Sequence, residues 1–216
     1  MAELKGRNWS AASLALLVAG VAAILAVHMI LSQLLGRSLT DGLLKREGIV
    51  AQEFLNSILA AEDSTDKLFA QPQPSPALQS FGTHVRSLPG IVRANIYSPD
   101  GFIRHSSEAN LVGVHFSDNK ELGQAFAGKI TSALEEIQAS DKSEHLALSQ
   151  LDGDHLIESY VPVTSPSGSV VAVVEFYRKD SWIGPMVAEM NRGIWIAAGL
   201  SSMIFALVML VALRRR

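Results

Sequence analysis

The residues with the clearest chemical potential lie around a predicted β-hairpin in the middle of the chain. Arg93 and Tyr97 are four positions apart, so an extended strand places both side chains on one face. The returning strand offers either His105 with Ser107 or Arg104 with Ser106, depending on which of its faces is turned the same way. A desolvated organic anion needs converging cationic and hydrogen-bonding groups. We therefore predict an anion pocket on this sheet face, with these binding residues: Arg93, Tyr97, His105, Ser107, His115 and Tyr160.

A plainer interpretation of the same residues stays open. Arg93 and Arg104 can be solvated charges on the surface of a sheet, and Tyr97 and Tyr160 can be core rings with a hydroxyl at the edge.

Catalytic, metal and cofactor sites have little support. The chain has no cysteine, no HxH or HxxxH pair and no glycine-rich nucleotide motif. Ser106 and Ser107 stand beside His105, but adjacent strand residues face opposite ways, so His105 cannot easily reach Ser106 as a general base. The two aspartates around Gly153 form a predicted turn with too few further oxygen ligands for a metal. We expect no enzyme activity and no cofactor.

Two long uncharged stretches lie near the ends of the chain. Residues 11–35 and residues 193–213 contain no charged side chain, and either stretch can cross roughly 30 Å of hydrocarbon as a helix. A cleaved signal peptide is the alternative for the first stretch, because Lys5 and Arg7 precede it. Its apolar run, however, exceeds the ~7 to 15 residues of a signal peptide core. We expect two transmembrane helices.

The charges predict the orientation. Lys5 and Arg7 precede the first span and three arginines follow the second, which favours cytoplasmic termini. Residues 36–192 contain 13 Lys and Arg against 20 Asp and Glu, a net charge of −7, which argues against a nucleic-acid partner. We predict a double-pass protein of the inner (cytoplasmic) membrane. Its expected parts are a cytoplasmic start (1–10), a first span (11–35), a periplasmic or extracellular domain (36–192), a second span (193–213) and a cytoplasmic end (214–216).

The outer domain begins with helical periodicity. Apolar residues between positions 39 and 58 recur at roughly helical spacing, with one turn missing around Arg46, which predicts a long stalk helix that continues the first span. This helix must end before the proline-rich residues 71–76. A short helix follows and stops at Pro89, with one apolar face made of Leu78, Phe81, Val85 and Leu88.

Strand periodicity replaces the helical pattern after Gly90. Val92, Ala94 and Ile96 are predicted on one face and the residues between them on the other, followed by a turn at 98–101 and a returning strand over 102–107. Further strands are predicted over residues 129–137, 144–151, 155–163 and 169–178. A short helix capped by Asp118 with Glu121 precedes them, and a helix that starts near Asp180 or Pro185 follows them into the second span. This order favours an α+β domain with an antiparallel sheet.

Five short motifs in a fixed order give a more specific resemblance. They are Asp100-Gly101, Ser106-Ser107, Leu111-x-Gly113, Glu121-Leu122 and Ala125-x-x-Gly128. The stretch that contains them resembles the centre of a single Cache domain, the PAS-like extracytoplasmic sensor of bacterial histidine kinases, chemoreceptors and cyclic-di-GMP enzymes. The motifs cover about residues 90–178, and the two-span layout extends the resemblance over the chain. It implies a five-stranded sheet flanked by the stalk helix, with a small-molecule pocket on the sheet face under the hairpin and the following loop.

The resemblance also implies signal transduction. We expect a signal-input protein, acting as a homodimer, that binds a small anionic solute and transmits occupancy through its membrane helices to a separate cytoplasmic or membrane partner. Only three arginines follow the second span, whereas kinases and chemoreceptors carry large cytoplasmic domains. Two alternatives remain open: a membrane adaptor whose outer domain binds a protein, and the truncated input half of a histidine kinase or chemoreceptor.

Overall fold

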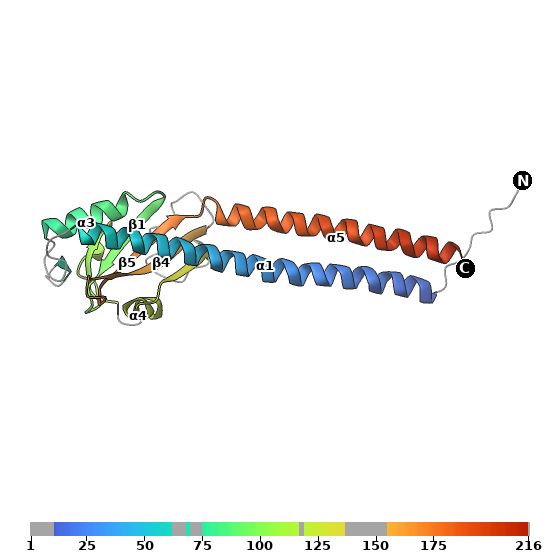
Figure 1. The fold of residues 1–216 in the computed structure, drawn as a ribbon, viewed down its shortest axis with the longest axis horizontal. Coiled ribbons are helices and arrows are strands. Elements are labelled where there is room, and N and C mark those ends of the chain that lie inside the picture. The colour runs from blue at the N-terminus through green and yellow to red at the C-terminus, as the bar shows by residue number, and fades with distance from the viewer. Residues whose placement is uncertain (1–10, 62–67, 70–74, 117–118, 137–154, 216) are drawn as a thin grey trace, which may run out of the picture. The chain divides into compact units, whose positions relative to one another are not determined.

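A computed structural model describes residues 11–61, 68–69, 75–116, 119–136 and 155–215. Its elements are, in chain order, α1 (Ala11–Ala60), α3 (Pro76–Arg86), β1 (Ile91–Tyr97), β2 (Ile103–Ser106), the 3-10 helix η1 (Ala109–Leu111), α4 (Lys120–Phe126), β3 (Thr131–Glu136), β4 (His155–Thr164), β5 (Val170–Lys179) and α5 (Ile183–Arg214) (Figure 1). They divide into two compact units. One joins the chain up to Thr40 with the chain from Pro185 onward, and the other comprises Asp41–Gly184.

The first unit consists of two apolar helical segments. The most apolar 18-residue stretch of α1 has a mean hydropathy of 2.7, and 0% of it is buried inside the protein. The corresponding stretch of α5 has a mean hydropathy of 2.4, and 6% of it is buried. Within this unit the Ser32 hydroxyl donates to Asn191 Oδ1 over 2.7 Å, and Gly20 leaves room for the ring of Phe205. Both helices are long and apolar enough to cross a membrane.

The second unit is built on a five-stranded sheet of order β2-β1-β5-β4-β3, in which every neighbouring pair is antiparallel. The predicted α+β class, the hairpin and the strands near 129–137, 155–163 and 169–178 are confirmed. The strand predicted over residues 144–151 and the turn around Gly153 lie outside the described residues.

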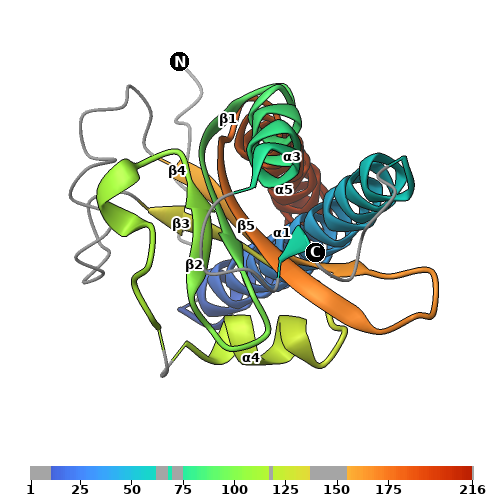
Figure 2. The ribbon, with the colours of Figure 1, turned by 90° about the vertical axis from the view of Figure 1, so that its left-hand side faces the viewer.

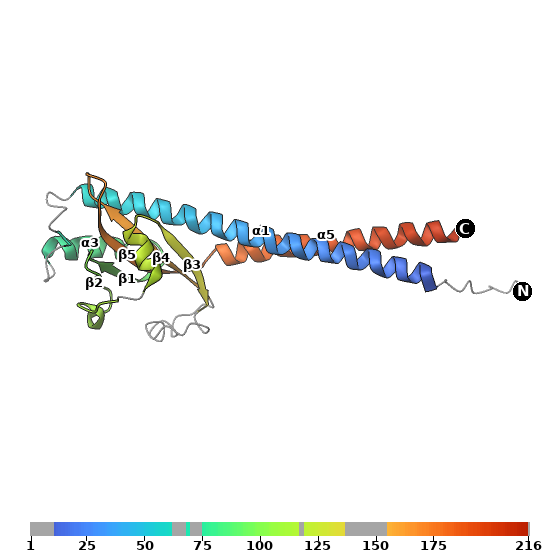
Figure 3. The same ribbon diagram turned by 90° about the horizontal axis from the view of Figure 1, so that it is seen from below.

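One face of the sheet carries the apolar core. Ala94 and Ile96 of β1 pack against α3 and against Leu55 and Leu59 of α1. β4 and β5 add these residues to the same core: Val161, Val163, Ala172, Val174 and Phe176. α3 starts at Pro76, and the Ser75 hydroxyl accepts the amide of Leu78 as its N-cap. The C-terminal part of α1 and α3 therefore cover the same face, while α4 lies on the other side of the sheet (Figure 2, Figure 3). In α3, Leu78, Phe81 and Val85 form the predicted buried face, whereas Leu88 follows the end of the helix.

Two local predictions need correction. The register of β1 shifts between Ile91 and Arg93, so Ile91 packs with the α3-side core while Val92 packs against Leu156 and Tyr177. The predicted grouping of Val92 with Ala94 and Ile96 is wrong because such a shift breaks the alternation of the strand.

The N-cap of α4 is Asn119, whose Oδ1 accepts the amide of Leu122 at 2.8 Å; the predicted cap, Asp118, lies outside the described residues.

Candidate functional site

The sheet face turned toward α4 is polar, and we call it the polar face. The register aligns one residue from each of the five strands: Ser106, Asn95, Glu175, Tyr160 and Thr131. A second row across the sheet, two positions further along each of four strands, contains these residues: Arg93, Tyr177, Glu158 and Ala133. Of these, Arg93, Asn95, Glu158, Tyr160, Glu175 and Tyr177 are all at most 3% exposed. The polar face is therefore a buried network rather than a solvated surface.

Glu175 is the centre of this network. Asn95 Nδ2 and the Tyr97 hydroxyl each donate to its Oε2 over 2.8 Å. The hydroxyls of Tyr160 and Tyr177 lie 3.0 Å and 2.5 Å from its Oε1. Both oxygens of a fully buried carboxyl group are thus hydrogen-bonded, as such burial requires.

Glu158 is the second buried acid, and it shares two donors with Glu175. Its Oε1 lies 3.0 Å from the Tyr160 hydroxyl and 2.7 Å from that of Tyr177. Burial, then the neighbouring Glu175 and Glu158, raise the pKa of both tyrosines, so the hydroxyls stay protonated and act as donors. Each hydroxyl has one proton, so two protons serve four oxygen contacts. The two acids share these donors.

Arg93 supplies positive charge to the same network. Its guanidinium carbon lies 4.2 Å from the centre of the Tyr177 ring, and Nη1 lies 3.3 Å from Glu108 Oε1. Burial by itself lowers the pKa of Arg93, but interactions with Tyr177 and Glu175 and hydrogen bonds to Tyr177 and Glu108 outweigh it, and the pKa is raised. A charged Arg93 therefore offsets the charge of the buried acids.

The structure brings together three of the six residues predicted to bind a ligand. Tyr97 and Tyr160 both hydrogen-bond Glu175, and Arg93 lies over the neighbouring Tyr177 ring. Ser106, from the other pair offered by the returning strand, also joins the network, because its hydroxyl donates to Asn95 Oδ1 over 2.7 Å.

The other three predicted residues lie elsewhere. His105 pairs with Ile96, which places it on the apolar face, where its ring packs against Gly82 of α3. Burial and the nearby Arg86 lower the pKa of His105. The Ser107 hydroxyl bonds the backbone of Ala94, and His115 is exposed beside Phe102, with ring centres 4.7 Å apart. Arg93 and His105 therefore do not share a face, which the predicted pocket required.

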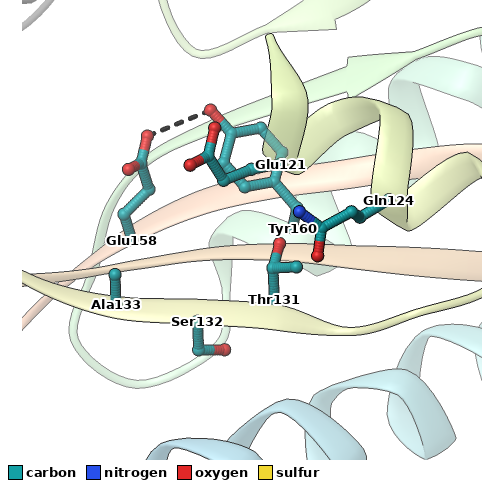
Figure 4. A pocket seen from close by; sticks show the side chains of 7 residues that line it. All are labelled: Glu121, Gln124, Thr131, Ser132, Ala133, Glu158 and Tyr160. Atoms are coloured by element: carbon teal, nitrogen blue, oxygen red, sulfur yellow. Dashed lines mark hydrogen bonds between the residues drawn. The ribbon is translucent and has the colours of Figure 1, made fainter.

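A cavity of about 250 Å³ opens beside the polar face. β4 contributes Glu158 and Tyr160, β3 contributes residues 131–133, and α4 contributes Glu121 and Gln124 (Figure 4). The Thr131 side chain points toward Gln124 and Tyr160, whereas Ser132 points away to the other face of the sheet (Figure 4). The cavity thus connects Glu158, one of the two buried acids, with the space under α4.

A second cavity, of about 220 Å³, lies between α1 and the sheet. Its wall is mainly apolar, with Val50, Ala51 and Phe54 from α1 and Phe176 from β5, and an ion pair between Glu47 and Arg178 at its side. It lacks a buried polar network, so it is the weaker candidate for solute recognition.

The two buried acids, Glu158 and Glu175, are not among the predicted binding residues, although the sequence contains a signal for them. Glu158 and Tyr160 in β4 repeat the spacing of Glu175 and Tyr177 in β5, so each strand carries a Glu-x-Tyr motif. A glutamate inside a strongly apolar strand is a mark of a paired, buried carboxyl group. Among the described residues, no group of three or more His, Cys, Asp or Glu is arranged to hold a metal ion.

Comparisons with known proteins found only distant structural similarities. No protein-family model and no curated protein sequence matches the chain. The sensor domain of Escherichia coli DcuS is 15% identical, with coverage of 70% of this chain and 98% of that chain and a TM-score of 0.45. An A. aeolicus nlh2 GAF domain is 16% identical over 76% of this chain and 98% of that chain, with a TM-score of 0.42. An extracellular ligand-binding receptor from Desulfohalobium retbaense is 12% identical over 70% of this chain and 25% of that chain, with a TM-score of 0.41. The five-stranded antiparallel sheet itself is the arrangement that the resemblance to Cache domains implies.

Proposed function

We propose that this chain is a double-pass membrane protein whose central domain lies outside the cytoplasm and binds a small solute beside the polar face. Binding of the solute is signalled across the membrane through the two apolar helices. The observation that carries the proposal is the cavity of about 250 Å³ that opens onto Glu158 and Tyr160, members of a buried network of ionisable side chains. The resemblance of the motifs to a Cache domain also implies a ligand pocket on the sheet, which supports the proposal.

The energetics of the polar face support a binding role. Two buried acids beside a buried guanidinium are costly to desolvate, and an apolar core of the same volume is often as stable or more stable. Charged groups with strongly perturbed environments gather at functional sites, particularly where a cavity reaches them. Ligand recognition accounts for the network better than stability does.

The proposed route of the signal follows the chain from the polar face into α5. Glu175 and Tyr177 lie on β5, and Asp180 comes directly after this strand. The Asp180 carboxylate accepts the backbone amides of Trp182, Ile183 and Gly184, which ties the end of β5 to the first turn of α5. A solute that binds one arrangement of β5 better than another would therefore shift the population of the attached helix. The homodimer expected from the sequence stays part of this proposal.

The membrane placement rests on the two apolar helices and on the charges beside them. Lys5 and Arg7 precede α1, and three arginines end the chain after the apolar part of α5. The acidic segment between the helices then faces the periplasm or the exterior.

Thermal unfolding of the purified full chain in detergent tests solute binding. We expect one chemical class in a panel of amines, amino acids, carboxylates and sugars to raise the melting temperature. A solute at a hundredfold excess over its Kd stabilises the native state by about 2.7 kcal/mol, a rise of roughly 5 to 10 °C for a domain of this size. The Glu53→Gln variant, changed on an exposed part of α1, should respond as the parent does. No shift with any compound, together with co-purification of a membrane protein, would favour the adaptor alternative.

A further inference from the structure

We infer that the cavity under α4 binds a small organic cation, an amine that presents an ammonium group to Glu158 and Glu121. The inference rests on the proposed function and specifies the chemical class of its ligand. It replaces the anion expected from the sequence, which depended on Arg93 and His105 acting together.

The charge of the wall is the first argument. The described residues that line the cavity include two glutamates and no lysine, arginine or histidine. Arg93 is not among these lining residues, and its guanidinium lies over the Tyr177 ring. The Lys129 ammonium donates to Gln124 Oε1 over 2.9 Å. Lys129 and Glu121 are both exposed, so water screens both charges, and the buried Glu158 has the larger effect inside the cavity. An anion in this space would meet two carboxylates, whereas a cation would be stabilised by them.

The balance of donors and acceptors is the second argument. Glu158 presents carboxyl oxygens at the inner end of the cavity, and its Oε1 lies 3.0 Å from the Tyr160 hydroxyl and 2.7 Å from the Tyr177 hydroxyl. Thr131 Oγ1 is buried in the cavity wall and has no hydrogen-bond partner among the residues that the structure describes. An ammonium group brings three donors and no acceptor, which complements carboxylate and hydroxyl oxygens.

Size and geometry narrow the class further. A volume of about 250 Å³ lies just below the usual range of pockets for drug-sized ligands, so the ligand is a compact amine. Tyr160 lines the wall together with Glu121 and Glu158, and its aromatic ring also attracts a cation (Figure 4). A bare divalent cation is the poorer fit, because the described residues hold no cluster of three ligating groups.

The experiment compares two four-carbon probes of opposite charge, putrescine and succinate, by thermal shift and calorimetric titration of the full chain in detergent. We expect putrescine to bind and to raise the melting temperature, and succinate to leave both unchanged. Glu158→Gln keeps the size of the side chain and removes its charge, and it should weaken putrescine binding at least about thirtyfold. Glu53→Gln, on an exposed part of α1, is the matched control and should bind as the parent does.

A second variant covers the case in which Glu158→Gln fails to fold. Glu121 is exposed on α4, so Glu121→Gln is expected to keep the melting temperature of the free protein and to weaken putrescine binding by roughly three- to tenfold. Undiminished binding in Glu121→Gln, or in a folded Glu158→Gln, would overturn the inference.

The outcomes separate this inference from the proposed function. A shift with succinate alone overturns the cation and leaves solute binding intact. No shift with either probe also overturns the cation, and the wider panel of solutes then decides separately whether the domain binds a solute at all.

Discussion

Arg93→Ala is expected to lower the free energy of unfolding by about 3 to 5 kcal/mol, because it removes the buried positive charge of the polar face. Arg93 interacts with Glu175, Glu108 and the Tyr177 ring, and its loss leaves carboxyl groups buried beside a void. Chemical denaturation of the full chain in detergent measures the change. Arg86→Ala, on the exposed side of α3, is the control and should stay within about 0.5 kcal/mol of the parent.

Two further variants separate charge from volume. Arg93→Met keeps most of the side-chain volume, so it should be nearly as destabilising as Arg93→Ala if charge dominates. Adding Glu175→Gln to Arg93→Met should restore part of the lost stability, because the two residues interact and their effects are not additive. If Arg93→Ala costs less than about 1 kcal/mol, the guanidinium does not hold the network together and our description of the polar face is wrong.

The second large effect is an all-or-none result in a topology assay. Alkaline phosphatase is active only outside the cytoplasm, so a fusion after Gly168, in the turn between β4 and β5, should be active. A fusion after Arg216 should be inactive, because the positively charged end of α5 is expected to stay inside.

The two fusions also separate the topologies. Activity after both positions would mean that the second apolar helix does not return the chain to the cytoplasm. Release of a shortened soluble product with the first 35 residues removed would support the signal-peptide alternative. An inactive fusion after Gly168 would contradict the proposed location of the domain.

Much of the fold follows from local sequence patterns. Alternation between positions 93 and 97, the Asp100-Gly101 turn and the apolar residues 170–174 predict β1, the hairpin and β5, because strand period and turn chemistry are local properties. The α3 face follows from helical spacing in the same way. Position 92 escapes prediction, since a bulge depends on how β1 pairs with β5, which is distant in sequence.

The site is predicted less completely than the fold, because its residues come from strands that are distant in sequence and their facing depends on the strand register. His105 faces α3 because the register pairs it with Ile96, and a slip of one residue would have turned it to the polar face. Glu158 and Glu175 meet only because β4 and β5 are neighbours in the sheet, with Tyr160 opposite Glu175. A hairpin-centred prediction therefore finds Arg93, Tyr97 and Tyr160 but not the acids that join them.

Hydrogen–deuterium exchange of the full chain, with and without the solute that raises its melting temperature most, tests the central claim most directly. If the solute binds beside the polar face, exchange should slow in α4 and β3, which line the cavity with β4. Unchanged exchange in α4 and β3, with protection confined to α1 and the segment near Leu88 that line the second cavity, would contradict the proposed site.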